Sequence, residues 1–336
     1  MKRPLRTLFY GMAHEHAPGK IASLKKLTDD FEVVAIADDT ARHSPTYHTD
    51  PFLAPEGCPI VSEAEALENR DIDCVFVEVA NRDLMEIAKV YAERGVPMHC
   101  DKPCGEAMGP YREVADICRA KKVPMQIGYM YRANPAIRFM REAVKAGWIG
   151  KVVFTEADMN HAYGNDDYQH YTGTMKGGIL YNLGCHLVDT LALFVEGDPV
   201  RATCVKGTAP GDPPDCLNRM SSFVEFPGAE MLIRSCSRAP GGVNCRRLRV
   251  DGTNGTFDLC PIERFDGEEL KLAMTLATPA GGYAAGRHEI SFGVQTDRYA
   301  GQLQELAAIV RGEIPDTTDF DHDLRVHEIT LKACDV

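Results

Sequence analysis

The segment Asp101-Lys102-Pro103 places a lysine directly after the apolar run 97–100. Residues at the carboxyl end of a parallel strand face the crevice in which open α/β sheets bind ligands. A lysine held there can polarise a hydroxyl or a carbonyl oxygen and can exchange a proton with it. Most lysines are solvated surface charges, but this position favours a catalytic role for Lys102.

A second polar group lies in the segment 177–189. Asn182, His186 and Asp189 are spaced i, i+4 and i+7, which on one helix forms a polar stripe among apolar neighbours. A buried imidazole between an amide and a carboxylate can carry a proton. A histidine that only fills the core is the alternative, and the three-residue stripe disfavours it. We therefore predict Lys102, His186 and Asn182 as the catalytic residues.

The turn at residues 9–19 has the position of a dinucleotide-binding loop. Such a loop uses glycines to turn tightly and to let the backbone approach a pyrophosphate. Gly11 meets the first need, whereas Ala13 and His16 stand where small residues are expected. Amide groups at the start of the next helix can still hold a phosphate. The alternative is a turn that binds nothing, and we favour a modified dinucleotide loop.

Asp38 ends the second apolar run, at the chain distance from Gly11 where an acidic side chain binds both ribose hydroxyls of an adenosine. Its charge repels a 2′-phosphate, so NAD is favoured over NADP. A lone strand-end aspartate is usually a turn residue, but its register with Gly11 favours the cofactor role.

Two loop histidines raise the alternative of a metal site. His14 and His16 can ligate a divalent ion together with His99 or Asp101. Closely spaced loop histidines more often hold no metal, and we predict none.

The elements that must position these residues follow two patterns. Short apolar runs alternate with amphipathic stretches up to residue 128, which predicts βαβ units and a parallel sheet. The predicted strands are 5–10, 32–37, 74–79, 97–100 and 124–129, with helices 18–27, 84–94 and 111–121. After helix 136–146, period-two strands at 151–158, 222–226, 231–235 and 248–251 predict a mostly antiparallel sheet. Helices at 296–311 and 321–333 close the chain.

We therefore predict an α/β protein of two domains. Residues 1–128 form a Rossmann-type dinucleotide-binding domain, and residues 129–336 form an α+β domain for substrate binding and oligomerisation. The C-terminal helix is expected to pack back on the first domain. A chain of 336 residues is long enough for two such cores.

Composition excludes several classes of partner. The net charge of -12 argues against nucleic acid and anionic membranes. The 12 cysteines form no C-x-x-C motif, which favours reduced core cysteines. The apolar stretch 8–13 is too short for a signal peptide, and no run reaches the roughly 18 residues of a membrane span. We expect a cytoplasmic protein.

The order of these motifs resembles the Gfo/Idh/MocA family of glucose-fructose oxidoreductases and inositol dehydrogenases. The motifs are the first turn, Asn81 after the third strand, 101–103, the segment Tyr131-Arg-Ala-Asn-Pro135, and 177–189. The resemblance spans the chain and implies a Rossmann domain followed by an open-faced α/β domain. It also implies NAD(P)-dependent oxidation or reduction of a secondary hydroxyl or ketone on a sugar, cyclitol or sugar derivative, and a homodimer or homotetramer.

Site residues are carried over by position. Lys102 matches the lysine of the family's Glu-Lys-Pro signature, and His186 matches its acid–base histidine. Asn182 stands where the family usually has aspartate, and an amide can orient a hydroxyl but cannot titrate. Leu84 replaces a frequent histidine. The predicted cofactor ligands are Gly11, Met12, Ala13, His14, Asp38, Asn81, Asp101 and Lys102. The predicted substrate ligands are Arg132, Asn134, His161, Tyr163, Asn182 and His186.

Two other functions remain open on this scaffold. One is a lyase, glycoside hydrolase or epimerase that uses retained NAD or a divalent metal near His14 and His16. The other is a ligand sensor without turnover, which the retention of Lys102 and His186 disfavours.

Overall fold

A computed structural model describes residues 2–12, 14–39, 54–162 and 166–336. The chain forms two compact units. The first contains residues up to Tyr129 together with Tyr299–Leu324, and the second contains Met130–Arg298 together with Arg325–Val336. The segment 299–324 thus belongs to the first unit, although it follows most of the second unit in the sequence.

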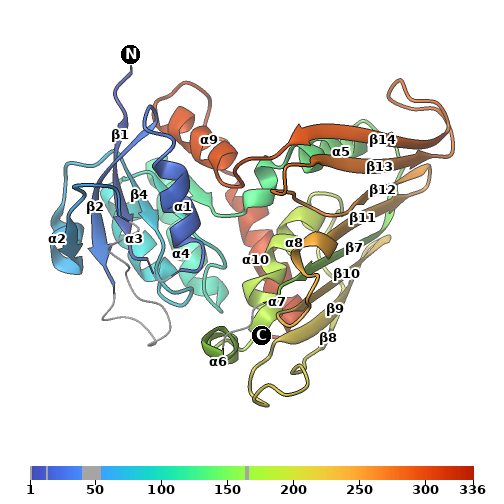
Figure 1. Cartoon of the computed structure of the whole chain (residues 1–336), viewed down its shortest axis with the longest axis horizontal. Helices are drawn as coiled ribbons and strands as arrows, with labels where there is room; N and C mark the ends of the chain where they lie inside the picture. Colours follow the sequence, from blue (N-terminus) through green and yellow to red (C-terminus); the bar gives the residue numbers. More distant parts are fainter. Residues whose placement is uncertain (1, 13, 40–53, 163–165) are drawn as a thin grey trace. The chain divides into compact units, whose positions relative to one another are not determined.

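The first unit is built on a six-stranded sheet in the order β3-β2-β1-β4-β5-β6, in which neighbouring strands are parallel (Figure 1). Its strands are β1 Leu5–Tyr10, β2 Phe31–Asp38, β3 Ile60–Ser62, β4 Cys74–Val77, β5 Met98–Cys100 and β6 Met125–Ile127. The strand order reverses between β1 and β4, and ligands of open α/β sheets bind at the carboxyl ends beside such a point. The predicted parallel sheet is confirmed.

The helices of the first unit are α1 Ala17–Leu24, α2 Glu63–Glu68, α3 Leu84–Arg94, α4 Met108–Lys121 and α9 Ala300–Val310. Gly95 ends α3 in the left-handed conformation, at φ 74°. Strand β3 and helix α2 are not predicted from the sequence. They contain only three and six residues, too few to show a period, and α2 is stabilised by a capping box between Ser62 and Glu65.

The second unit is built on an eight-stranded sheet in the order β14-β13-β12-β11-β7-β10-β9-β8. Its strands are β7 Val152–Asn160, β8 Arg201–Val205, β9 Arg219–Phe226, β10 Ala229–Cys236, β11 Arg247–Gly252, β12 Gly255–Leu259, β13 Glu269–Leu276 and β14 Gly286–Val294. All neighbours are antiparallel except β7 and β10. The predicted mostly antiparallel sheet is confirmed.

One face of the eight-stranded sheet is covered by helices (Figure 1). The helices of this unit are α5 Pro135–Lys145, α6 Asp166–Gly173, α7 Gly178–Asn182 and α8 Gly184–Ala192, with 3-10 turns η3 Met130–Ala133 and η4 Val243–Cys245. Helix α10, Phe320–Cys334, crosses the division between the units. On the opposite face Arg234 pairs with Asp158, and Arg247 pairs with Asp258.

The segment 178–192 differs from the single helix that its polar stripe predicts. Helix α7 ends at Asn182, Leu183 has φ -103°, and α8 begins at Gly184. A side chain at Gly184 would meet Leu180, and one at Gly178 would meet Leu217. The stripe is therefore divided between two short helices, although Asn182, His186 and Asp189 are all buried.

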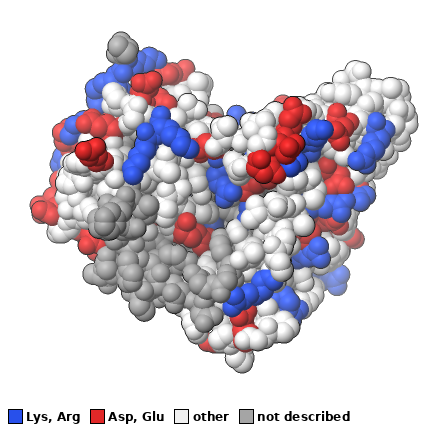
Figure 2. Space-filling view, viewed as in Figure 1, with Lys and Arg blue, Asp and Glu red and all other residues white. Residues whose placement is uncertain are grey.

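No helix among the described residues is long and apolar enough to cross a membrane. On the face drawn in Figure 2, basic and acidic side chains are interspersed. This mixture gives no extended basic surface on that face.

Candidate functional site

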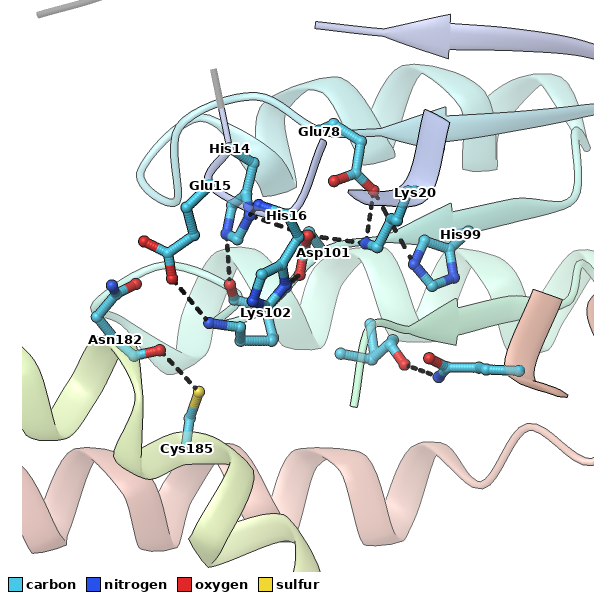
Figure 3. Close-up of polar contacts among 12 residues, drawn as sticks. His14, Glu15, His16, Lys20, Glu78, His99, Asp101, Lys102, Asn182 and Cys185 are labelled. Carbon is cyan, nitrogen blue, oxygen red and sulfur yellow. Dashed lines mark hydrogen bonds and ion pairs between the residues drawn. The ribbon is translucent and has the colours of Figure 1, made fainter. Parts of the chain in front are cut away.

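Lys102 follows β5 in the first unit and is held on both sides of its backbone (Figure 3). Its amide donates to Asp101 Oδ1 at 2.7 Å, and its carbonyl oxygen lies 2.9 Å from His14 Nε2. Its ammonium lies 3.5 Å from Glu15 Oε1. The lysine therefore occupies a fixed position at the carboxyl end of the parallel sheet.

Asp101 is the centre of a buried ionic cluster. Its Oδ2 lies 2.9 Å from His14 Nδ1 and 2.7 Å from Lys20 Nζ, and its Oδ1 lies 3.2 Å from His16 Nδ1. Burial alone would raise the pKa of Asp101, but His14 and Lys20 outweigh it and hold that pKa well below its ordinary value. Asp101 is therefore a carboxylate that organises the loop around Lys102.

Lys20 joins Asp101 to a second buried carboxylate. Its Nζ also lies 2.7 Å from Glu78 Oε1, and all three side chains are fully buried. Burial would lower the pKa of Lys20, but the two carboxylates outweigh it and raise that pKa. Burial, reinforced by the charge of Asp101, raises the pKa of Glu78 well above its ordinary value. Charge pairing thus satisfies groups that would otherwise be costly to bury.

His14, His16 and Asp101 can also be considered as ligands of a metal ion. One ligand atom of each lies within 4.8 Å of the others. However, Lys20 places an ammonium on the same carboxylate oxygen that faces His14. A cation at this point would repel Lys20, so the donor set favours a hydrogen-bonded ionic cluster over a metal site.

The turn at residues 9–19, called the glycine loop below, has backbone amides that donate to other groups of the protein. Gly11 has φ +83°, and a Cβ there would meet Asp39 and Val79. The Met12 amide donates to Asp39 Oδ1 at 3.1 Å, and the His14 amide donates to the Glu78 carbonyl. The predicted roles of Met12 and His14 in cofactor binding are not tested by these contacts. Ala13, also predicted there, lies outside the described residues.

The strand ends fit a dinucleotide. Asp38 is the last residue of β2 and is exposed, so its carboxylate is accessible to a ribose. Asn81 is buried in the turn between β4 and α3. Together with the strand order and the close approach permitted by Gly11, these positions match the site at which Rossmann sheets hold NAD(P).

In the second unit, Asn182 and His186 lie among aromatic side chains. The Asn182 amide donates to the Tyr168 hydroxyl at 2.9 Å, and the Asn182 backbone carbonyl accepts from Cys185 Sγ at 3.4 Å. The ring centroids of His186 and Tyr131 are 5.6 Å apart. Asn182 is thus oriented by its neighbours, and His186 lies against an aromatic wall.

Two of the predicted substrate ligands belong to charged clusters of this unit. Arg132 Nε lies 2.9 and 3.1 Å from the two oxygens of the buried Asp189. The fully buried Arg246 pairs with Glu263 at 2.6 Å and donates to His161 Nε2 at 2.6 Å. Because a guanidinium cannot accept, the ring of His161 presents a lone pair to it.

The contacts of Asn134 give it a structural role. Its Oδ1 caps α5 by accepting from Ala136 and Ile137, and its Nδ2 donates to the Ile262 carbonyl at 2.8 Å. Substrate binding by Asn134 stays a prediction. Tyr163, also predicted there, lies outside the described residues.

Sequence reasoning misses Lys20, Glu78, Glu15 and Asp39 as neighbours of this site. A visible signal exists for two of them. Glu78 interrupts the apolar run 74–80, and Lys20 lies on the buried side of a mostly apolar helix. Charged residues in such positions are buried only when paired.

Comparison with known proteins agrees with this architecture. Residues 137–258 match the family described as GFO/IDH/MocA C-terminal domain. D-xylose 1-dehydrogenase (NADP(+)) 2 of Haloferax volcanii is 26% identical over 310 residues, covering 90% of this chain and 84% of that protein. Inositol 2-dehydrogenase of Rhizobium meliloti is 22% identical over 314 residues, covering 91% of this chain and 90% of that protein.

A solved structure shows the same fold. The oxidoreductase of Agrobacterium radiobacter in complex with NAD+, L-tartaric acid and magnesium has a TM-score of 0.74 at 16% identity, covering 97% of this chain and 94% of that one. The fold and site thus define a two-unit protein with a Rossmann sheet and a large mixed sheet. The resemblance seen in the sequence motifs is confirmed by the match to the family's C-terminal domain and by the similarity to inositol 2-dehydrogenase.

Proposed function

We propose that the chain is an NAD(P)-dependent oxidoreductase acting on a secondary hydroxyl or ketone of a sugar, cyclitol or sugar derivative. The observation that carries this function is the fixed position of Lys102 at the carboxyl end of β5, in a sheet of dinucleotide-binding order. The names of the related xylose and inositol dehydrogenases support the same substrate class.

The chain's own residues supply binding and proton transfer. When bound, the nicotinamide supplies hydride transfer. We assign proton exchange with the reacting oxygen to Lys102 and, in the second unit, to His186. Asn182 orients a hydroxyl, because its amide is held by Tyr168 and cannot titrate. Arg132 and His161 are proposed as further substrate ligands.

We favour NAD over NADP. The exposed Asp38 carboxylate at the end of β2 can accept from ribose hydroxyls and repels a 2′-phosphate. The related D-xylose dehydrogenase is named for NADP(+), whereas the Agrobacterium radiobacter structure contains NAD+. The preference is therefore a property to be measured on this chain. We also propose that it acts as a homodimer or homotetramer.

Calorimetric titration with NAD+, NADH, NADP+ and NADPH tests the cofactor. Turnover is then followed by the absorbance of reduced nicotinamide against aldoses, ketoses, inositols and sugar acids. We expect binding of at least one nucleotide and turnover of a carbohydrate that depends on it. Absence of binding for all four nucleotides overturns the proposal.

A further inference from the structure

We propose that His14 is a positioning residue for Lys102, acting from the glycine loop together with Asp101. This inference rests on the proposed function, in which Lys102 exchanges a proton with substrate. It adds to that function a specific device that fixes the lysine.

The device is a closed set of three buried contacts. Asp101 Oδ1 accepts from the Lys102 amide at 2.7 Å, and His14 Nε2 contacts the Lys102 carbonyl oxygen at 2.9 Å. His14 Nδ1 then lies 2.9 Å from Asp101 Oδ2. Both polar groups of the Lys102 backbone are thereby held by side chains that also hold each other, and all three residues are buried.

Two contacts of His14 face acceptor oxygens, and a third faces a backbone donor. A carbonyl oxygen and a carboxylate oxygen both accept, so only the imidazolium form can donate to both. The His16 amide also lies 3.2 Å from Nδ1 and would need a lone pair there. The carboxylate contact is shorter and charge-assisted, and we regard it as the stronger of the two.

The rest of the cluster fixes Asp101. Lys20 Nζ contacts Asp101 Oδ2 at 2.7 Å and is itself held by Glu78, while Gly128 leaves the room that Asp101 occupies. A Cβ at Gly128 would lie 2.8 Å from Asp101 Oδ1. The carboxylate therefore cannot shift freely, and it presents fixed oxygens to Lys102 and His14.

This arrangement couples the loop to the lysine. His14 and Glu15 are adjacent, and they contact the backbone and the ammonium of Lys102 respectively. A displacement of the loop is thus transmitted to Lys102. A misplacement of about 1 Å in a reacting group can cost on the order of 10²-fold in rate.

Two substitutions separate positioning from general support of the loop. In His14→Gln the side-chain amide nitrogen takes the approximate place of Nε2 and can still donate to the Lys102 carbonyl. In His14→Asn it takes the place of Nδ1 and can donate only to Asp101. We expect kcat to fall on the order of 10²-fold in His14→Asn and less than about tenfold in His14→Gln. KM and the nucleotide Kd should change less than about threefold, because ground-state binding is retained.

The same two substitutions at His322, outside the cluster, serve as controls for loss of an imidazole and should leave kcat unchanged. Equal losses of kcat in His14→Gln and His14→Asn, or no loss in either, overturn the proposal.

Crystal structures of the two His14 variants give a readout that needs no turnover. We expect the Lys102 backbone to move in His14→Asn and to stay in place in His14→Gln. An unmoved Lys102 backbone in both overturns the positioning role, even if the unaltered protein is an active dehydrogenase. Failure of the unaltered protein to bind nucleotide overturns the proposed function, while these structures still decide whether His14 positions Lys102.

Discussion

The ammonium of Lys102 lies 3.5 Å from the carboxylate of Glu15, a residue of the glycine loop. Lys102 is fully buried, and the Glu15 side chain is 10% exposed. An ion pair with so little exposure is weakly screened by solvent. The loop thus provides a titratable carboxylate beside the proposed acid–base lysine, whereas the amide at Asn182 cannot titrate.

Glu15→Gln is expected to lower kcat/KM by about tenfold, equivalent to about 1.4 kcal/mol of transition-state stabilisation. Glutamine keeps the size of the side chain but removes the charge that orients the ammonium. Steady-state kinetics and thermal unfolding measure the effect, with Glu93→Gln on the exposed side of α3 as the matched control. Unchanged kcat/KM in Glu15→Gln would show that the ion pair has no part in turnover.

Lys102→Met is expected to lower kcat by roughly 10²–10⁴-fold, the usual range for loss of a general acid–base group. Methionine preserves most of the apolar volume, so the folded structure should be retained, although the loss of the pair with Glu15 lowers the unfolding midpoint. Calorimetry and steady-state rates distinguish binding from chemistry. Lys89→Met, which removes a surface ammonium paired with Glu113, is the control. Full activity in Lys102→Met contradicts the assigned role.

The strand that precedes Lys102 and the strand that ends at Asp38 could be predicted, because clear turn residues bound their apolar runs. The break at Leu183 could not, because the close packing of Gly184 against Leu180 and of Gly178 against Leu217 is visible only in the folded chain. Local spacing gave the stripe correctly as a set of buried residues but not as one helix.

The buried cluster was also beyond prediction from local pattern. Lys20 contacts Glu78 and Asp101, which are 58 and 81 positions away in the sequence. Only the folded sheet brings these three residues together. The histidines of the loop were visible as a pair. Their common partner Asp101 was visible only as a possible cofactor or metal ligand, whereas its contacts with Lys20 and the Lys102 amide indicate a positioning role.

Asp38→Ser is expected to shift the ratio of NADP to NAD affinity toward NADP by about tenfold, or about 1.4 kcal/mol. The exposed carboxylate no longer repels a 2′-phosphate, and its hydrogen bonds to the ribose are weakened. Calorimetric Kd values for both nucleotides measure the ratio. Glu93→Ser, with the same change in net charge, should leave it unchanged. An unchanged ratio in Asp38→Ser would remove this residue from the cofactor site.

Stability should decrease as the pH is lowered, because of His99. Burial lowers the pKa of this side chain from 6.5 to about 3. The unfolded chain takes up a proton near pH 6.5 that the folded chain refuses. The stability that His99 contributes is therefore present above that pH and lost as pH falls toward about 3. Over the first one and a half units this amounts to about 2 kcal/mol.

Other buried groups also change the stability over this pH range. The test therefore compares how steeply stability depends on pH in the unaltered protein and in a His99 variant. The pKa of His16 is lowered in the same way, whereas the raised pKa of Glu78 acts in the opposite direction. His99→Asn keeps a donor for Gln126, which His99 Nδ1 contacts at 2.9 Å, but cannot titrate. Urea unfolding at about pH 7 and about pH 5 should show a smaller loss of stability in His99→Asn, by about 2 kcal/mol. If both proteins lose stability equally over this interval, His99 is not the group that takes up the proton.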